Sequence, residues 1–230
     1  MSGLISIIVP VYNEAATIQA VIERLLAIDL PGPREIIVVN DGSKDGTRTV
    51  LDSLRGISDA VTIHHVDPNQ GKGHAVRLGI SKSTGEVVAI QDADLELDPA
   101  QIARLVEPIL SGEADIVYGS RFLRGSAGVP FISRMANYGL TLFTNVLYGS
   151  RLTDMETCYK IMRGSVARSL TLTANRFDIE PEITAKLLTG GHRIVEKPVT
   201  FSPRSRAAGK KIRWQDGVHA VKVLLRLRFR

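Results

Sequence analysis

The feature that most constrains the fold is a regular alternation of short apolar segments with stretches of helical periodicity over the first 120 residues. The apolar segments are rich in β-branched residues, which is typical of strands buried in a parallel sheet. Strands are predicted at 4–11, 35–40, 61–66, 86–90 and 116–118. Strands joined by helical crossovers predict an α/β fold with a mostly parallel, Rossmann-like central sheet flanked by helices.

Beyond residue 120 the alternation is less regular. Helices are predicted near 135–147 and 180–188, and strands near 158–162 and 193–199. A last helix begins near Trp214. We therefore expect a single domain over 1–213, followed by a C-terminal helix over 214–230.

Composition excludes several classes of protein. With 44% apolar and 23% charged residues, the chain has the balance of a globular protein and not of a disordered one. No apolar run approaches the roughly 18 residues of a membrane-spanning helix. No basic segment precedes the first apolar stretch, so a cleaved signal peptide is not expected. The single cysteine, Cys158, excludes an internal disulfide, and a reducing, cytoplasmic compartment fits.

The C-terminal segment is strongly basic. Residues 204–230 hold nine Lys or Arg and one Asp, a net charge of +8, whereas residues 1–203 sum to −3. Within this segment an apolar side and a basic stripe recur at helical spacing: Val218, Val221, Leu224 and Leu225, then His219, Lys222, Arg226 and Arg230. This pattern predicts an interfacial helix resting peripherally on the cytoplasmic membrane face. The alternative is a docked helix with a solvated basic edge.

Polar residues cluster where three predicted strands end, at 12–14, 40–43 and 91–94. The carboxyl ends of parallel strands form one edge of the sheet, which is where ligands bind in such folds. The chain has neither the Gly-x-Gly-x-x-Gly motif after its first strand, typical of dinucleotide binding, nor the Gly-x-x-x-x-Gly-Lys-Ser/Thr phosphate-binding loop. Without such a loop, a diphosphate ligand would need a metal ion. Asp92 and Asp94 directly follow a buried strand, and their hard oxygens suit Mg²⁺ or Mn²⁺. The alternatives are an acidic surface loop or a calcium loop, and the latter lacks the required Gly and Glu.

Several motifs occur in a fixed order along the chain. They are residues 7–14, 38–43, Gly71-Lys72-Gly73, Asp92-Ala93-Asp94, 118–122, Arg134 with Asn137, Thr153-Asp154, and Glu180 with Glu182. Together they resemble the signatures of glycosyltransferase family 2, in particular its polyprenyl-phosphate branch, typified by dolichyl-phosphate mannose synthase. The resemblance covers residues 4–217 and implies the GT-A fold. It also implies a nucleotide-sugar half over 1–120, an acceptor half over 121–213, and transfer with inversion at the anomeric carbon.

The resemblance implies roles on the donor side. Binding of the nucleotide sugar falls to Pro10, Tyr12, Glu14, Asp41, Lys72 and Asp92. Asp94 would bind the metal and act catalytically, with Asp92 and Glu96 as further ligands. A divalent ion there stabilises the charge that develops on the leaving nucleoside diphosphate.

On the acceptor side, Arg121 and Arg134 would meet an acceptor phosphate, with Arg121 also catalytic. Arg204 and Lys211 would close over the phosphates. Asp154 is the first candidate for a general base or an orienting group, and Glu156 is the second. A phosphate acceptor is already anionic and barely needs a base. Glu180 and Glu182 would bind a sugar hydroxyl or cap a helix.

The expected activity is metal-dependent transfer of a hexose, mannose from GDP-mannose, to a polyprenyl phosphate. The alternatives are UDP-glucose or UDP-N-acetylglucosamine as donor, and a saccharide hydroxyl as acceptor. A nucleotidyltransferase would need a Gly-rich, basic loop after the first strand, which residues 12–15 do not supply. Nucleic acid is not expected as a partner, because the basic tail has few aromatic residues and the carboxylate edge would repel a phosphate backbone.

Overall fold

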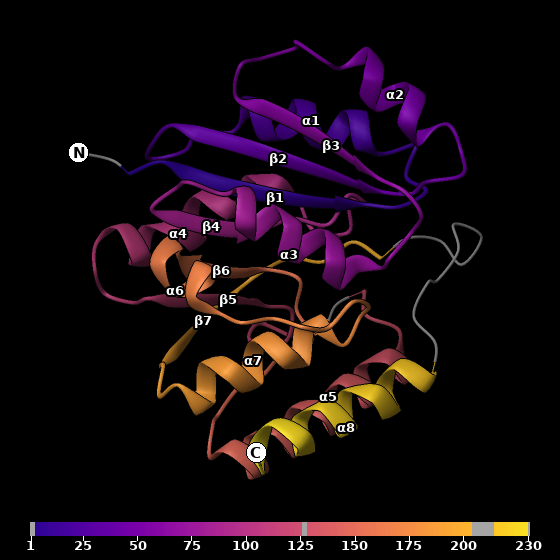
Figure 1. Cartoon of the computed structure of the whole chain (residues 1–230). Helices are drawn as coiled ribbons and strands as arrows, with labels where there is room; N and C mark the ends of the chain where they lie inside the picture. The colour runs from indigo at the N-terminus through magenta and orange to yellow at the C-terminus, as the bar shows by residue number, and fades with distance from the viewer. Residues whose placement is uncertain (1–2, 126–127, 204–213, 230) are drawn as a thin grey trace.

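Seven strands form one sheet through the centre of the molecule, in the order β3-β2-β1-β4-β6-β5-β7 (Figure 1). The computed structural model describes residues 3–125, 128–203 and 214–229. The strands are β1 Ile5–Val11, β2 Arg34–Asp41, β3 Val61–Val66, β4 Val87–Ile90, β5 Ile116–Ser120, β6 Lys160–Arg163 and β7 Ile194–Pro198. All neighbours pair in parallel except β6, which runs antiparallel to both β4 and β5. The predicted α/β fold with a mostly parallel sheet is confirmed.

Helices flank this sheet and fill the C-terminal half. They are α1 Ile18–Ala27, α2 Thr47–Ser53, α3 Lys72–Lys82, the 3-10 helix η1 Pro99–Gln101, α4 Ile102–Leu110, α5 Phe131–Tyr148, α6 Gly164–Ser169, α7 Ile179–Thr189 and α8 Trp214–Arg228. The N-terminal strands and α2 lie at one end of the molecule in Figure 1, and α5 and α8 lie at the other.

The core is built around β1, whose seven residues are all buried between β2 and β4. This burial explains the uninterrupted apolar run in the sequence. Helix α3 packs closely on this strand at Gly79, where an added Cβ would lie only 2.3 Å from Ile8 Cγ2. The first residue of this helix is Lys72.

The reversed direction of β6 brings a second segment to the ligand edge. The carboxyl ends of β1, β2, β4 and β5 share one edge of the sheet. Because β6 is antiparallel to β4 and β5, its amino end lies at that same edge. Residues 153–159, which lead into β6, therefore arrive beside the residues that follow β4 and β5.

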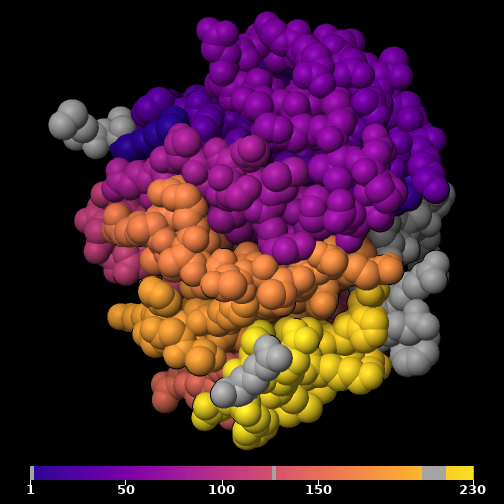
Figure 2. Space-filling model, in the orientation of Figure 1, coloured from indigo at the N-terminus to yellow at the C-terminus, as the bar shows by residue number. Residues whose placement is uncertain are grey.

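The C-terminal helix α8 is docked against α5 and α7, and it covers one end of the molecule in the space-filling view (Figures 1 and 2). Ala220, Val223 and Leu224 are buried, and Leu224 packs with Met155 and Ala185. The Tyr148 hydroxyl donates a hydrogen bond of 2.7 Å to the Leu224 carbonyl. This face of the helix is thus part of the protein core, whereas Val218 and Leu225 are exposed. Among the described residues, no helix has the length and apolar character needed to cross a membrane.

Candidate functional site

The three polar strand ends converge, as the sequence predicts. The Asn13 amide donates to Ser43 Oγ at 2.9 Å, and Asn13 Oδ1 accepts from the Lys44 amide at 2.8 Å. The Thr17 hydroxyl donates to the carbonyl of Ala93 at 2.7 Å. These bonds join the loops after β1, β2 and β4 into one edge.

Asp41 is buried at the end of β2 and holds the loop that precedes α3. Its carboxylate accepts hydrogen bonds from Asn69 Nδ2 at 2.7 Å, from the Gln70 amide at 3.0 Å and from the Gly71 amide at 2.6 Å. In this structure Asp41 therefore supports the wall of the site. Its contact with a base or ribose stays a prediction.

Pro10, Tyr12 and Glu14 lie on or directly after β1. Pro10 is buried opposite Val39 of β2, Tyr12 is half-buried, and Glu14 is buried. Glu14 Oε2 lies 3.0 Å from the Thr17 hydroxyl oxygen. The structure thus places all three at the expected edge, and their contact with a nucleotide stays a prediction.

The loop after β4 carries the predicted metal ligands. The Asp92 side chain is 28% exposed, and Asp94 and Glu96 are half-buried. Asp94 Oδ1 accepts from the Glu96 amide at 3.1 Å, and Leu95 between them has a φ of 61°. This turn places Asp94 and Glu96 on the partly exposed rim of the loop.

A three-carboxylate metal site is not assembled in this loop. Within residues 3–125, 128–203 and 214–229, no three His, Cys, Asp or Glu side chains come together to hold a metal ion. The metal roles of Asp92, Asp94 and Glu96 therefore stay predictions. Mg²⁺ needs only one or two protein carboxylates when phosphates and water complete its shell, and the two aspartates supply such donors. The donor set fits a dication that arrives with a diphosphate.

Lys72 is bound to carboxylates and does not project freely. Its Nζ lies 2.8 Å from Asp92 Oδ1 and 3.0 Å from Glu180 Oε1. Burial alone would lower the pKa of Lys72, but the two carboxylates outweigh it and hold this pKa well above its usual range. In the same way Lys72 lowers the pKa of Asp92 against the effect of burial. Both groups therefore stay charged at neutral pH.

Arg121 follows β5 and is anchored by Asp154. The guanidinium donates two hydrogen bonds, Nε to Oδ2 at 2.7 Å and Nη2 to Oδ1 at 2.8 Å. Asn137 Nδ2 adds a third bond to Oδ1 at 2.9 Å, and the carboxylate is fully buried. With both oxygens engaged, Asp154 has the geometry of the orienting group, one of the two roles that the sequence leaves open.

Glu196 of β7 binds the backbone that carries Asp154. Its carboxylate accepts from the backbone amides of Thr153 at 2.8 Å and Asp154 at 3.0 Å. Burial raises the pKa of Glu196. Glu196 could not be recognised from the sequence, because its strand carries no motif and its partners lie far away in the chain.

Glu156 differs from Asp154 in that one of its oxygens has no partner. Oε1 is buried and makes no hydrogen bond within the described part of the chain. Burial, assisted by Glu180 and Asp154, raises the pKa of Glu156 from an ordinary 4.5 to about 7. A carboxyl group with such a pKa holds and releases a proton near neutrality, which is what a general base requires.

The raised pKa of Glu156 predicts a pH-dependent stability. A carboxyl group that binds its proton more tightly in the folded state stabilises the protein as pH falls from about 7 towards 4.5. Glu156→Gln should therefore raise the free energy of unfolding at pH 8 by about 2 kcal/mol and change it little at pH 5. Urea denaturation at the two pH values measures this difference. Glu107→Gln, on the exposed face of α4, is the control, and an equal effect of Glu156→Gln at both pH values would contradict the assignment.

A groove of about 450 Å³ lies beside Arg121 and Asp154 on the acceptor half. It is lined by Phe122, Arg134, Asn137, Tyr138, Thr141, Leu142, Asn145, Leu152 and Thr153. Asn137 thus both lines the groove and bonds Asp154, while Arg134 is exposed and lies over the Phe131 ring. Arg204 and Lys211, the other two predicted phosphate ligands, lie outside the described residues.

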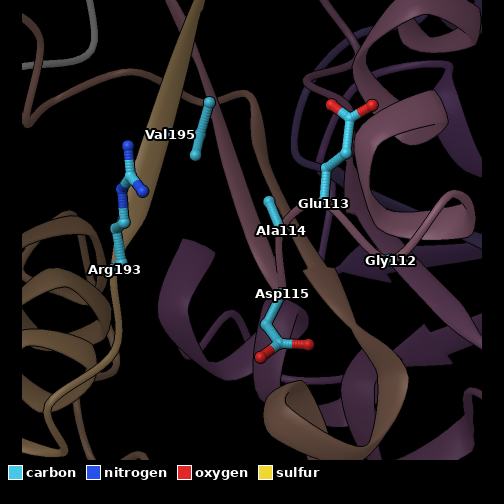
Figure 3. Close-up of a pocket in the computed structure, with 6 residues that line it drawn as sticks. All are labelled: Gly112, Glu113, Ala114, Asp115, Arg193 and Val195. Atoms are coloured by element: carbon cyan, nitrogen blue, oxygen red, sulfur yellow. The ribbon is translucent and has the colours of Figure 1, made fainter.

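A smaller hollow of about 160 Å³ lies at the opposite edge of the sheet. Arg193 and Val195 line one side of it, and residues 112–115 line the other (Figure 3). These residues precede or begin β5 and β7, so the hollow is remote from the carboxyl ends of the strands. It contributes nothing to the site.

Comparison with known proteins relates the chain to sugar transferases. Residues 6–171 match the family described as Glycosyl transferase family 2. The chain is 30% identical over 212 residues to an undecaprenyl-phosphate mannosyltransferase of Micrococcus luteus, covering 88% of this chain and 85% of that protein. It is 28% identical to a dolichol-phosphate mannosyltransferase of Pyrococcus furiosus, covering 90% of this chain but 58% of that protein.

A solved structure shows the same fold. Glucosyl-3-phosphoglycerate synthase of Mycobacterium tuberculosis, in complex with Mn²⁺, UDP and phosphoglyceric acid, superposes with a TM-score of 0.76 at 19% identity. The match covers 98% of this chain and 78% of that one. At this identity the likeness confirms the expected GT-A-like fold and no more.

Proposed function

The chain belongs to glycosyl transferase family 2 and is a glycosyltransferase, and on that premise we propose that it transfers mannose from GDP-mannose to a polyprenyl phosphate. Relatives named for mannosyl transfer to undecaprenyl and dolichol phosphate support this choice of sugar and acceptor. A relative in Rhizobium johnstonii, 27% identical and covered over 61% of its length, is named for dodecaprenyl-phosphate galacturonate. The acceptor class is thus shared among these relatives, whereas the sugar varies.

One observation carries the proposal. The loop with Asp92 and Asp94 and the anchored Arg121 occupy one edge of the sheet, and an amphipathic groove containing Arg134 adjoins Arg121. A nucleoside diphosphate with a dication matches the carboxylates, and a second phosphate matches the arginines. The apolar walls of the groove, including Leu142, Tyr138 and Leu152, suit the first isoprene units of a lipid.

Each residue then has a defined task. Pro10, Tyr12, Glu14 and Asp41 form the wall for the base and ribose. Asp94, with Asp92, would hold Mg²⁺ or Mn²⁺, which when bound neutralises charge on the departing diphosphate. Arg121 and Arg134 orient the acceptor phosphate. Asp154 keeps the guanidinium of Arg121 in one orientation. The acceptor is already an anion, so no residue has to remove a proton from it.

A second candidate function uses a saccharide hydroxyl as the acceptor. The observation in its favour is Glu156, a carboxyl group whose pKa is raised by burial to about 7. A hydroxyl acceptor must lose a proton during attack, and Glu156 has the right affinity to take it.

A donor and acceptor screen tests the proposal. The protein is incubated with Mn²⁺ or Mg²⁺, a short polyprenyl phosphate, and radiolabelled GDP-mannose, UDP-glucose or UDP-N-acetylglucosamine. The proposal expects label to move into the organic phase with GDP-mannose. Label that moves only from a UDP-sugar would correct the donor. Donor turnover with no lipid labelling, and labelling of an added saccharide, would favour the second candidate.

The outer face of the α5–α8 pair suits a membrane surface, and we extend the proposal to peripheral attachment there. The exposed apolar side chains of α5, of α8 and of the residue after α8 are Phe131, Ile132, Met135, Tyr138, Leu142, Val146, Val218, Leu225 and Phe229. Basic side chains lie among them, and Lys222, Arg226 and Arg228 are exposed. An apolar face rimmed by cations binds anionic bilayers. The groove with Arg134 lies on α5, so attachment would bring it close to a lipid-linked phosphate.

Point substitutions on α5 test the attachment. Ile132→Glu with Val146→Glu should reduce co-sedimentation with vesicles containing anionic lipid by about tenfold or more, because two apolar side chains no longer enter the bilayer. Both residues are 78% exposed, so the fold should be unaffected. Ile57→Glu is the control, at an exposed apolar residue that follows α2. Unchanged binding of the double variant would exclude this surface. Deleting α8 is less informative, because Leu224 is buried in the core.

A further inference from the structure

Four charged side chains of alternating sign form a chain that runs from the half-buried Asp92 and Lys72 to the buried Glu180 and Lys160. Asp92, Lys72, Glu180 and Lys160 come from the loop after β4 and the starts of α3, α7 and β6. Lys72 Nζ lies 2.8 Å from Asp92 Oδ1, and Glu180 bridges Lys72 at 3.0 Å and Lys160 at 2.6 Å. The Lys160 and Glu180 side chains are 0% and 6% exposed.

Glu180 is the central link, because it bonds one lysine with each oxygen. Through Lys72 it acts on Asp92, whose two oxygens lie 2.8 and 3.1 Å from the same ammonium group. This contact determines which way the Asp92 carboxylate faces. Glu180 lies in the first turn of α7, where the helix dipole further favours a negative charge.

On its other side, Glu180 acts on the turn that leads into β6. Lys160 Nζ donates to the carbonyls of Met155 at 3.0 Å and Thr157 at 2.5 Å. That turn directly follows Asp154, which anchors Arg121. One carboxylate therefore connects the metal-ligand loop to the segment that orients the phosphate-binding arginine.

We infer that Glu180 is a positioning residue that keeps the donor-side carboxylates and the acceptor-side arginine in register. This inference rests on the proposed function. Transfer requires the diphosphate and the attacking phosphate to be aligned closely, and a displacement of about 1 Å can lower a rate by about 10²-fold. A buried ionic chain restricts geometry more than an apolar contact would, since each charge needs its neighbour in place.

Glu180→Gln is the direct test. Glutamine keeps the shape of the side chain, but its NH₂ group meets one of the two ammonium groups as a donor facing a donor. The variant should lower kcat by about 10- to 100-fold and raise the Mn²⁺ concentration needed for half-maximal rate. The KM for the polyprenyl phosphate should change less than kcat.

Glu182→Gln is a matched control from the same turn of α7. Glu182 is also buried, but its carboxylate accepts from Thr173 and Ala174 and pairs with Lys186, away from Asp92 and Arg121. It should lower thermal stability, lower kcat less than Glu180→Gln does, and leave the Mn²⁺ concentration for half-maximal rate unchanged. An equal loss of kcat in both variants would overturn the inference, since it would reveal only a structural role. If Glu180→Gln does not fold, Glu180→Asp keeps the charge with a shorter reach and should show an intermediate loss of kcat.

Hydrogen exchange separates this inference from the proposed function. Glu180→Gln should speed amide exchange in both segments, 92–98 and 154–158, whereas Glu182→Gln should affect residues 173–174. If the protein transfers no sugar from any donor, the proposed function is overturned. The hydrogen exchange of Glu180→Gln then still tests the positioning role. Unchanged exchange in both segments of Glu180→Gln would overturn the positioning role itself.

Discussion

Asp94→Asn is expected to lower kcat for sugar transfer by about 10²- to 10³-fold while leaving the fold intact. Asparagine loses the negative charge that would attract a dication, but its carbonyl can still accept the 3.1 Å bond from the Glu96 amide. The measurement is the initial rate of lipid labelling over a range of Mn²⁺ concentrations.

Asp98→Asn is the control for this experiment. Asp98 ends the same loop, and its Oδ1 accepts from the amide of Ala100 two residues on, as Asp94 does from Glu96. It is exposed and should tolerate the change with little effect on kcat. Full activity of Asp94→Asn, or an equal loss in Asp98→Asn, would refute the metal role of Asp94.

Asp154→Ala is expected to cause the largest loss of stability, about 3–5 kcal/mol in the free energy of unfolding. The substitution removes two bonds to the Arg121 guanidinium and one to Asn137 from a fully buried position. The arginine is then left largely buried without its counter-charge, since its side chain is 18% exposed. Urea denaturation followed by circular dichroism gives the value.

Asp115→Ala removes a carboxylate that also pairs with an arginine, but at the surface. Asp115 Oδ1 lies 2.6 Å from Arg163 Nε, but its side chain is 54% exposed. Water screens such a pair, so the expected loss is about 0–1 kcal/mol. A loss as small as this for Asp154→Ala would show that the Arg121 pair does not hold the acceptor side together.

Much of the fold was predictable because burial leaves a direct trace in the chain. The apolar run of β1 and the repeated helical spacing identify parallel strands and crossovers. The direction of β6 was not predictable, because four residues, Lys160–Arg163, carry no sign of which way they run. Its reversal is what brings Asp154 and Glu156 to the ligand edge.

Site residues could be predicted where neighbouring residues in the sequence form a motif. Contacts between residues far apart in the chain could not be predicted. Asp92 and Asp94 could be recognised as candidate metal ligands because they directly follow a buried strand. The role of Lys72 at the nucleotide sugar stays a prediction, and its pairing with Asp92 and Glu180 could not be read from the sequence. A glutamate in the first turn of a helix gives the same pattern whether it binds a sugar, caps a loop as Glu182 does, or bridges two lysines.

The C-terminal helix illustrates a different limit. An apolar side flanked by cations is compatible with a membrane surface and with a docked helix, since both bury apolar side chains. In the structure the side with Ala220, Val223 and Leu224 faces the protein, while Val218 and Leu225 remain exposed. Only the packing partners in α5 and α7 distinguish the two sides.

The most direct test of the account is a crystal structure of the protein with GDP-mannose and Mn²⁺, with the metal located by its anomalous signal. The account predicts a manganese peak within coordinating distance of an Asp94 oxygen, with the diphosphate bridging towards the Arg121 side of the edge. A peak bound elsewhere, or an Asp94 carboxylate turned away from an ordered sugar nucleotide, would contradict it.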